Sequence, residues 1–429
     1  MYTTLWATFL VAFVLSLVMT PAAIKLAPKI GAMDVPKDDR RMHVKAMPRF
    51  GGMAIFIGTM VSTAIFLLQL DHRILGIMIG GVLIYLAIKK EMEPALLLPI
   101  GFGAILVNLP LSGAVTQAIY DEEGVLNILY NAGIANELFP LMLFVGIGAM
   151  IDFTPLLSNP KLMIFGAAAQ FGIFFTLLMA RLLGFSLPDA VSIAVIGAAD
   201  GPTSIVVANI MKSGYIGAIV VAAYSYMALV PIVQPPVIKL CTTRKERRIH
   251  MEYAQHEVSQ TTKILFPIVI TVLAGLVSPR SVQLIGFLML GNLIRECGVL
   301  NGLSETAQKT LANLITLFLG ITIAANMRAE QFLTWNTLLI LGLGLVAFVF
   351  DTIGGVMIAK FLNLFLKKKI NPMIGAAGIS AFPMSARVIN KLGLEEDNQN
   401  FLLMHAVGVN VSGQIASVLA GGLLLALFG

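Results

Sequence analysis

Asp200 is an acidic residue inside an otherwise apolar, uncharged segment. A carboxylate within a bilayer is costly unless a partner compensates its charge, and no Lys or Arg lies close to it in the sequence. The hydroxyls of Thr203 and Ser204, and carbonyl groups freed where Gly201 and Pro202 interrupt the helix, are hard oxygen ligands. We therefore predict that Asp200 and Thr203 bind Na⁺. The alternative is a protonated carboxyl that only packs.

A second oxygen donor, Asn410, lies in the last apolar run, residues 401–427. We expect this run to be broken in its middle, where Gly408 and Gly413 flank Asn410. The amide oxygen of Asn410 could complete a cation site, and the alternative is a hydrogen bond to another helix.

A third segment, between Asn371 and Asn390, is apolar but interrupted. Gly375 and Gly378 break its helix, while Asn371 and Ser380 supply oxygens. These oxygens extend the predicted cation site to a second part of the chain.

Other polar side chains within apolar segments have both functional and structural interpretations. Arg387 could attract a substrate carboxylate or extend to the membrane surface. Tyr226 could carry protons or form a buried hydrogen bond. Asp351 and His405 fit structural roles better than catalytic ones. No phosphate-binding loop, zinc site or hydrolase triad is present, and the two cysteines do not form a CxxC motif.

Composition places the chain in the membrane. Of 429 residues, 58% are hydrophobic and 12% are charged, and the mean hydropathy is +0.88. Soluble domains carry about 25% charged residues. We assign the net charge of +6 to cytoplasmic loops and expect no nucleic-acid partner.

Apolar runs long enough to cross a bilayer are frequent. They are residues 5–20, 53–70, 74–88, 95–109, 138–151, 162–183, 216–238, 264–277, 282–294, 311–325 and 337–366.

Basic loops indicate the topology, because short loops rich in Lys and Arg remain in the cytoplasm. Residues 25–49 carry seven such side chains, and residues 244–248 carry the densest cluster. The acidic connection 111–137 is expected outside. Basic loops stay on the cytoplasmic side only if residues 190–211 enter the membrane and return to the same side. The chain would then turn at Asp200, with arms about 15 Å long. By the same argument, residues 371–390 enter from the cytoplasm.

Two pairs of short segments suggest an internal repeat. Residues 196–200 resemble 374–378, and residues 144–147 resemble 318–321, at offsets of 178 and 174 positions. Broken segments at equivalent places in two halves of opposite direction are typical of secondary-transporter cores.

The predicted fold class is therefore an all-α polytopic membrane protein. Its core is transporter-like and built from an inverted repeat, with broken helices and two oppositely oriented re-entrant hairpins. We expect an N-terminal two-helix membrane module at residues 1–70 and a core at 71–429. The repeats span about 95–240 and 263–429.

Several motifs resemble the beta subunits of sodium-ion-translocating, biotin-dependent decarboxylases. This group includes the oxaloacetate, methylmalonyl-CoA and glutaconyl-CoA decarboxylases, and the resemblance runs from about Tyr85 to the C-terminus. The motifs are GAAAQFG at 166–172, ADGPT at 199–203, AAYSYMALVP at 222–231, QPP at 234–236, INP at 370–372 and QNFLLMHA at 399–406.

The resemblance implies a mechanism and partners. A carboxyltransferase (alpha) subunit moves CO₂ to biotin on a biotin carrier protein. The beta subunit decarboxylates this carboxybiotin, which is not covalently attached to it, consumes a proton and exports Na⁺. A small membrane-anchor (gamma or delta) subunit completes the complex. We expect a homo-oligomer in the inner membrane of a bacterial cell.

The resemblance also implies roles for individual residues. Asp200, Asn371 and Asn410 match the family's sodium-site positions. Val409 stands where the family pattern has Pro, so a helix break there depends on glycine alone. The pattern has no acid at the place of Asp351.

Four further residues match positions tied to transport or decarboxylation. They are Tyr226, Gly375, Ser380 and Arg387. The resemblance thus implies a catalytic role for Tyr226, Ser380 and Arg387.

Residues 34–40 and 48–53 resemble the start of the polyprenyl-phosphate sugar-1-phosphate transferases. A membrane phosphosugar transferase is therefore a rival hypothesis. Such an enzyme needs paired aspartates on later cytoplasmic loops to hold Mg²⁺, and no Asp-Asp pair follows residue 90. A third hypothesis, a secondary Na⁺-coupled carboxylate transporter, fits the same core, and only the family resemblance separates it.

Overall fold

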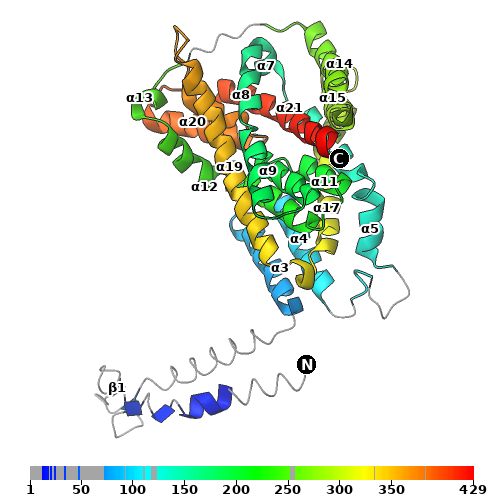
Figure 1. Ribbon diagram of the computed structural model, residues 1–429, viewed down its shortest axis with the longest axis vertical. Coiled ribbons are helices and arrows are strands. Elements are labelled where there is room, and N and C mark those ends of the chain that lie inside the picture. The colour runs from blue at the N-terminus through cyan, green and yellow to red at the C-terminus, as the bar shows by residue number, and fades with distance from the viewer. Residues whose placement is uncertain are drawn as a thin grey trace. The chain divides into compact units, whose positions relative to one another are not determined.

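The computed structural model describes residues 72–429 except 92, 110–111, 117–122, 252–256, 333 and 382; of the first 71 residues it describes 12–18, 20–21, 24–25, 33–34 and 47–48. The chain divides into two compact units, Met1–Leu75 and Gly76–Gly429 (Figure 1). In the first unit, β1 (Met33–Asp34) pairs antiparallel with β2 (Met47–Pro48). The helix expected at 53–70 lies outside the described residues, so the two-helix module stays a prediction.

Beyond the strand pair, the described structure is helical. The larger elements are α3 (His72–Lys89), α4 (Pro94–Asn108), α5 (Val125–Gly133), α6 (Leu138–Met150), α8 (Met163–Ala168), α9 (Phe171–Leu182), α10 (Leu187–Ala194), α11 (Gly201–Ile210), α12 (Ile216–Cys241), α14 (Gln260–Val277), α15 (Val282–Glu296), α16 (Asn301–Thr306), α17 (Ala312–Ile323), α19 (Trp335–Leu362), α20 (Met384–Glu396) and α21 (Leu403–Phe428). The shorter ones are α7 (Thr154–Ser158), η1 (Pro160–Leu162), η2 (Val195–Ala198), α13 (Arg244–Arg247), η3 (Pro279–Ser281), η4 (Ala307–Leu311), η5 (Ala324–Asn326), α18 (Ala329–Phe332) and η6 (Pro372–Gly378).

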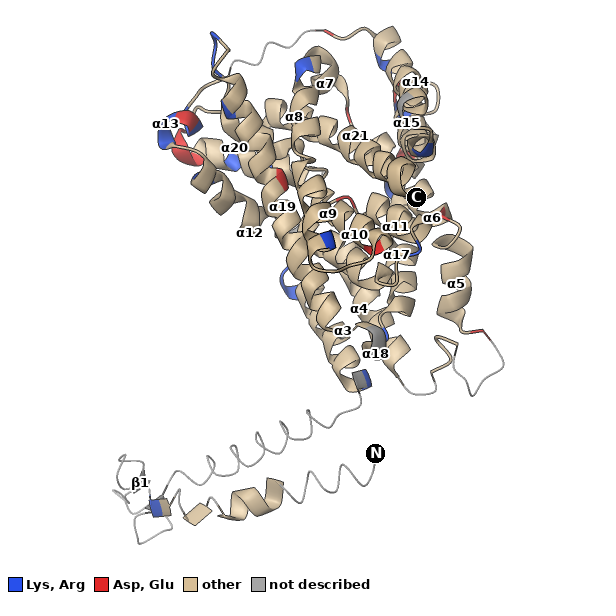
Figure 2. Ribbon diagram, in the orientation of Figure 1, with Lys and Arg blue, Asp and Glu red and all other residues tan. Residues whose placement is uncertain are grey.

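The prediction of an all-α polytopic membrane protein is confirmed. Among the described residues, four helical stretches are long and apolar enough to cross a bilayer, and up to six are if each of two bent pairs is one span. Charged side chains gather at α13 and near helix ends, and the helices between are largely uncharged (Figure 2). Every apolar run predicted from residue 74 to residue 366 forms a helix or a helix pair.

Sequence reasoning missed α5, which lies within the expected acidic connection. This helix bends by 59° into α6 after a short break. The expected external position of Asp121 concerns a residue outside the described part of the chain.

Residues 190–211 form the first predicted hairpin. Ala199 adopts a left-handed conformation with φ of 52°, and Asp200 is extended, so the chain turns between η2 and α11. At the open end, Ser213 Oγ donates a hydrogen bond of 2.7 Å to Asp189 Oδ1. Because these residues lie at the start of α10 and just after α11, the two arms run side by side in opposite directions.

Residues 371–396 form the second hairpin, from η6 and α20. Asn371 Nδ2 donates to the Arg247 carbonyl at 2.8 Å, and Arg247 Nε donates to Glu396 Oε1 at 2.7 Å. Both ends of the hairpin therefore meet at Arg247. Within it, Ser385 Oγ donates to the Ala376 carbonyl at 3.2 Å and joins the two arms.

The expected break in the last apolar run is wrong, because α21 is continuous from Leu403 to Phe428. Its glycines permit close packing. A Cβ on Gly413 would lie 2.1 Å from the Gly378 carbonyl oxygen, and one on Gly408 would lie 2.7 Å from the Leu162 side chain. Glycine in membrane helices commonly serves such close approaches.

The paired segments of the predicted repeat occupy similar elements. Residues 195–198 and 372–378 are both 3₁₀ segments that precede a hairpin tip, and residues 144–147 and 318–321 lie in α6 and α17, which pack together. Figure 1 shows α19 running beside α9 and α12.

Helix α19 crosses the second hairpin at a pair of glycines. A Cβ on Gly355 would lie 2.1 Å from the Gly375 carbonyl oxygen, and one on Gly375 would lie 2.0 Å from the Gly355 carbonyl oxygen. The two backbones are therefore in direct contact. Gly375 acts as a packing residue here, because the 3₁₀ segment continues through it.

This crossing predicts that Gly355→Ala will destabilise the protein by about 1–3 kcal/mol, because the backbones must separate. Gly342→Ala is the matched control in the same helix, since its Cβ would meet nothing within 4 Å. Alanine there is expected to be neutral or stabilising by about 0.5–1 kcal/mol. Thermal unfolding in detergent measures both. Equal destabilisation by the two variants would contradict the packing account.

Candidate functional site

The tips of the two hairpins meet. Ser380 N, in the turn of the second hairpin, donates to the Ala198 carbonyl, in the turn of the first, at 3.0 Å. Each tip leaves backbone groups that its own helix cannot satisfy, and this bond uses one from each. The two re-entrant segments therefore form one junction, as expected for inverted halves of a transporter core.

Asp200 is the buried acid at this junction, and 3% of its surface is exposed. Its Oδ2 accepts hydrogen bonds from Thr203 Oγ1 at 2.7 Å, Ser417 Oγ at 3.0 Å and Gln414 Nε2 at 3.2 Å. Its Oδ1 has only a long contact of 3.5 Å with Thr203 N. Within the described part of the chain, no ion pair involves Asp200. All of these donors are neutral, so none compensates its charge.

One face of α21 reaches both tips. Gln414 and Ser417 contact Asp200, while Asn410, one turn earlier, contacts the second hairpin. Positions i, i+4 and i+7 share a helix face, and four residues span about 6 Å of axis. Sequence reasoning missed Gln414 and Ser417. Their helical spacing from Asn410 was the available signal, but the expected break in this helix hid it.

Amide side chains bind the carbonyl groups at the tip of the second hairpin. Asn410 Nδ2 donates to the carbonyls of Ala377 at 3.0 Å and Ile379 at 2.6 Å. Gln234 Nε2 donates to Ala376 at 2.7 Å, and Gln170 Nε2 contacts Gly378 at 3.4 Å. Four successive carbonyls thus have side-chain donors from three different helical segments. Gln170 and Gln234 were part of the family-like motifs, but their contacts were not predicted.

Two of these amides leave an oxygen without a partner. Asn410 Oδ1 and Gln170 Oε1 are buried and accept no hydrogen bond within the described structure. Neither amide can be flipped, because exchanging its nitrogen and oxygen would place the oxygen against carbonyl oxygens. The part of the chain that the structure describes contains no group of three or more His, Cys, Asp or Glu that could hold a metal. A cation here would therefore be bound by one carboxylate and neutral oxygens, a donor set that suits a hard ion.

Ser380 and Gly201 also belong to the junction. Ser380 Oγ donates to the Gly413 carbonyl at 3.2 Å, which links the second tip to α21. A Cβ on Gly201 would lie 2.1 Å from the ring of Tyr224, so glycine is needed there for close packing. Pro202 lies in the first turn of α11, and the helix is interrupted just before it, at Ala199 and Asp200. Tyr224, whose buried hydroxyl has no recorded partner, was not predicted as a site residue.

Asn371 is not brought to the junction. Its Oδ1 accepts from Met373 N at 3.1 Å, and its Nδ2 donates to Arg247 and Ile249 carbonyls at the open end of the hairpin. The seven-residue 3₁₀ segment η6 separates it from the tip by about 14 Å. Its structural role is to close the base of the hairpin.

Among the described residues, no hydrogen bond or ion pair joins Arg387 or Tyr226 to Asp200. Arg387 is exposed on α20 and lines a cavity of 400 Å³ with Asn390, Lys391 and Leu403 among others. Tyr226 donates from its hydroxyl to the Leu341 carbonyl on α19. A Cβ on Gly344 would meet both the Tyr226 ring and Ile196 of the first hairpin. The catalytic roles of Arg387 and Tyr226 stay predictions.

Asp351 is fully buried in α19 and binds the start of α9. Its Oδ1 accepts from Gly172 N at 2.5 Å, and a Cβ on Gly197 would lie 2.6 Å from its Oδ2. It therefore fixes α19 against α9 and the first hairpin. This contact agrees with the structural interpretation.

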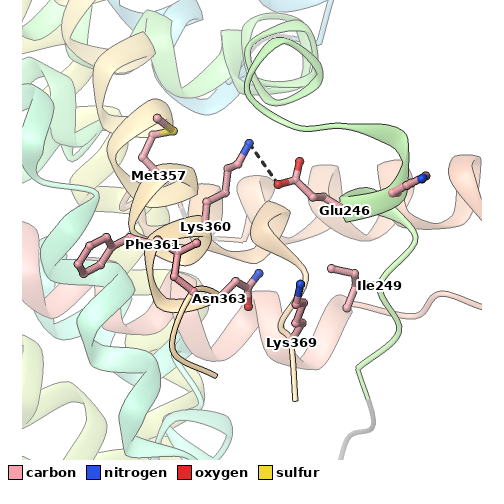
Figure 3. A pocket seen from close by; sticks show the side chains of 9 residues that line it. Glu246, Ile249, Met357, Lys360, Phe361, Asn363 and Lys369 are labelled. Carbon is pink, nitrogen blue, oxygen red and sulfur yellow. Dashed lines mark ion pairs between the residues drawn. The ribbon is translucent and has the colours of Figure 1, made fainter. Parts of the chain in front are cut away.

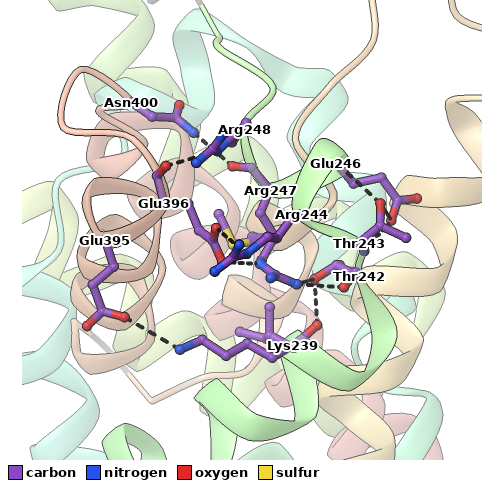
Figure 4. Close-up of polar contacts among 12 residues, drawn as sticks. Lys239, Thr242, Thr243, Arg244, Glu246, Arg247, Arg248, Glu395, Glu396 and Asn400 are labelled. Carbon is purple, nitrogen blue, oxygen red and sulfur yellow. Dashed lines mark hydrogen bonds and ion pairs between the residues drawn. The ribbon is translucent and has the colours of Figure 1, made fainter.

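Arg247 closes the base of the second hairpin (Figure 4). Besides Glu396, it binds the Thr242 carbonyl through Nη1 at 2.6 Å, and its own carbonyl accepts from Asn371 and from Asn400 at 2.9 Å. The hydrogen bond from Arg247 holds the pKa of Glu396 below its usual value, although burial opposes this.

Comparison with known proteins agrees with the sequence resemblance. The family model described as Na⁺-transporting oxaloacetate decarboxylase beta subunit matches residues 72–428. The chain is 48% identical over 375 residues to methylmalonyl-CoA decarboxylase subunit beta of Propionigenium modestum, covering 83% of this chain and 95% of the relative. It is 49% identical over 352 residues to glutaconyl-CoA decarboxylase subunit beta of Acidaminococcus fermentans, covering 82% and 92%. It is 44% identical over 406 residues to a probable oxaloacetate decarboxylase beta chain of Vibrio cholerae, covering 81% and 94%.

The base of the second hairpin yields a test. Glu396→Gln leaves a buried guanidinium uncompensated, so we expect a loss of about 3 kcal/mol. Amide hydrogen exchange should accelerate in residues 371–378 and 384–396. Glu395→Gln is the control, because its pair with Lys239 is longer, at 3.6 Å, and half exposed. Similar exchange in both variants would contradict the assignment.

The same pair predicts a pH dependence. A carboxyl with a lowered pKa stabilises the fold above its unfolded pKa, and this contribution is lost as pH falls through the folded pKa. The wild type should therefore lose stability below about pH 4.3, and Glu396→Gln should lose less over that range. Parallel pH–stability curves would contradict this.

Proposed function

Because the chain belongs to the family of beta subunits of Na⁺-transporting decarboxylases, we propose that its hairpin junction carries Na⁺ across the membrane and that decarboxylation of carboxybiotin on a partner subunit drives this transport. Family membership implies a complex with other decarboxylase subunits. We propose that these are a biotin carrier protein, a carboxyltransferase and a small membrane anchor, in a bacterial inner membrane.

One observation carries the assignment of the ion site. Asp200 lies buried at the junction, with neutral hydrogen-bond donors and no basic partner among the described residues. A carboxylate in such a place is stabilised by a cation or by protonation. The unpartnered oxygens of Asn410 and Gln170, on elements that contact the same tips, supply neutral ligands for Na⁺. Thr203 adds a hydroxyl that contacts Asp200, and Ser380 adds one at the tip of the second hairpin.

The proposed role of Arg387 is to bind the carboxylated carrier. Its exposed guanidinium and the ammonium group of neighbouring Lys391 line one cavity with Glu395, which pairs with Lys239, and two cations there suit an anionic carboxylate. In the reaction, the N–C bond of carboxybiotin breaks, CO₂ leaves and the biotin nitrogen takes up one proton. One negative charge therefore disappears near the second hairpin.

Coupling requires that this loss of charge favours one state of the hairpins. Arg387 lies on α20, the arm of the second hairpin that follows the turn at Ser380. A carrier bound at Arg387 can therefore change which conformation of the junction is favoured. A ligand shifts a conformational equilibrium only through different affinities for the two states. Na⁺ and the carboxylated carrier should then raise each other's affinity by the same factor.

A secondary Na⁺-coupled carboxylate transporter remains the alternative function. It would use the same ion site without a decarboxylase partner. Purification distinguishes the two, because a biotinylated subunit should copurify with this chain only if it is part of a decarboxylase. The phosphosugar transferase hypothesis gains no support, since the family match begins at residue 72.

For the ion site, we expect Asp200→Asn to weaken Na⁺ binding about a hundredfold, since it removes the compensating charge without changing size. Decarboxylation should lose its Na⁺ stimulation, and ²²Na⁺ uptake into proteoliposomes should disappear. Asp189→Asn is the control, a half-buried acid at the open end of the same hairpin. If Asp200→Asn took up ²²Na⁺ as fast as the wild type, the assignment of the ion site would be wrong.

For the division of roles, we expect Asn410→Ala to raise the Na⁺ concentration for half-maximal activity about tenfold. Arg387→Ala should instead raise the carrier concentration for half-maximal turnover about ten- to a hundredfold and leave Na⁺ binding unchanged. Rates measured against both ligands, with Na⁺ binding by calorimetry, separate the two effects. If Arg387→Ala abolished Na⁺ binding while turnover survived, the division would be wrong.

A further inference from the structure

A cavity separate from the hairpin junction lies beside the end of α19. It has a volume of 610 Å³, and its polar lining comes from Lys245 and Glu246 of α13, Lys360 of α19 and Lys369 (Figure 3). Glu246 is already engaged, since its Oε1 lies 3.2 Å from Lys360 Nζ. Three lysines and one glutamate leave the cavity positively charged.

Two of these lysines have no recorded counter-charge. No ion pair within the described residues involves Lys245 or Lys369, and both side chains are exposed. They come from segments far apart in sequence that both line this cavity. The geometry therefore concentrates uncompensated positive charge around a hollow large enough for a phosphate-bearing group.

An apolar groove continues from this cavity along α19. It has a volume of 520 Å³ and is lined by Ala168, Phe171, Ile353, Gly354 and Ile358. Met357 and Phe361 line both the groove and the basic cavity. About half of each of these two side chains is exposed, at 54% for Met357 and 53% for Phe361. The basic cavity and the apolar groove are therefore contiguous along α19, because both are lined by Met357 and Phe361.

We propose that this combined site binds one anionic phospholipid, with its phosphate head group between Lys245 and Lys369 and an acyl chain in the groove beside Gly354. Basic pockets at the end of membrane helices bind anionic head groups, and each lysine near such a surface contributes a few-fold in affinity. The groove explains why the ligand is a lipid, because a free phosphate has no group to fill it. A lipid bound there would contact both α13, which contains Arg247 at the base of the second hairpin, and α19.

The experiment uses the full chain in its membrane complex, delipidated in neutral detergent. Native mass spectrometry follows titration with dioleoyl phosphatidylglycerol, dioleoyl phosphatidylcholine or soluble sn-glycerol 3-phosphate. We expect one saturable phosphatidylglycerol site and phosphatidylcholine binding at least about tenfold weaker. Glycerol phosphate should not compete. Equal binding of the two lipids, or full competition by glycerol phosphate, would overturn the proposal.

Charge variants test the head-group position. Lys245→Gln combined with Lys369→Gln should weaken phosphatidylglycerol binding about 25-fold, at about fivefold per lysine. Lys367→Gln is the matched control, an exposed lysine of the same basic run that does not line the cavity, and its effect should stay within about twofold. If Lys367→Gln and Lys369→Gln weakened phosphatidylglycerol binding equally, binding would depend on general surface charge and the proposed head-group position would be wrong. If the double variant lost a protein subunit but kept its lipid, the cavity would bind a protein partner and the lipid assignment would fail.

Discussion

The structure depends on the cost of a carboxylate buried in a membrane protein. Asp200 cannot reach water, and its donors Thr203, Gln414 and Ser417 are neutral. Either a cation or protonation must therefore remove the cost of its charge. Everything around it brings polar atoms to this point without adding a basic group. A binding site for a transported cation needs this balance, because a resident Lys or Arg would displace the ion.

The two hairpins carry a second energetic cost, which side chains from the surrounding segments reduce. A chain that turns inside the membrane leaves carbonyl groups without helical partners. Gln170, Gln234 and Asn410 supply hydrogen-bond donors to the second tip from three separate segments. Glycine contacts, such as Gly355 with Gly375 and Gly413 with Gly378, let the backbones approach closely enough for these bonds. The junction is thus closely packed, side-chain donors bind the carbonyls of its second tip, and two buried amide oxygens have no hydrogen-bond partner among the described residues. Because α21 touches both tips, the surroundings of Asp200 and the relative position of the hairpins depend on the same helix.

Much of this arrangement could be predicted from the sequence. The basic loops and the isolated Asp200 predicted the two hairpins and the tip of the first, because charge and turn residues are local signals. The partners Gln414 and Ser417 could not be predicted once α21 was expected to break. Glycine signals either a turn or a close approach, and only the packing against Gly378 and Leu162 distinguishes these for Gly413 and Gly408. Val409 keeps the backbone N–H that a proline would remove, and this is consistent with the continuous helix. Asn371 was grouped with Asp200 by family resemblance, which carries no distance, and its side chain instead binds the base of the hairpin.

The most direct test of the ion site is to locate a bound cation. Crystals of the protein grown without Na⁺ and soaked in Tl⁺, a cation with strong anomalous scattering, would show where a monovalent ion binds. The account predicts an anomalous peak at the meeting of the two tips, within coordination distance of Asp200 and of the amide oxygen of Asn410. The peak should be lost when Na⁺ competes and in crystals of Asn410→Ala. A peak elsewhere in the protein, with none at the junction, would contradict it.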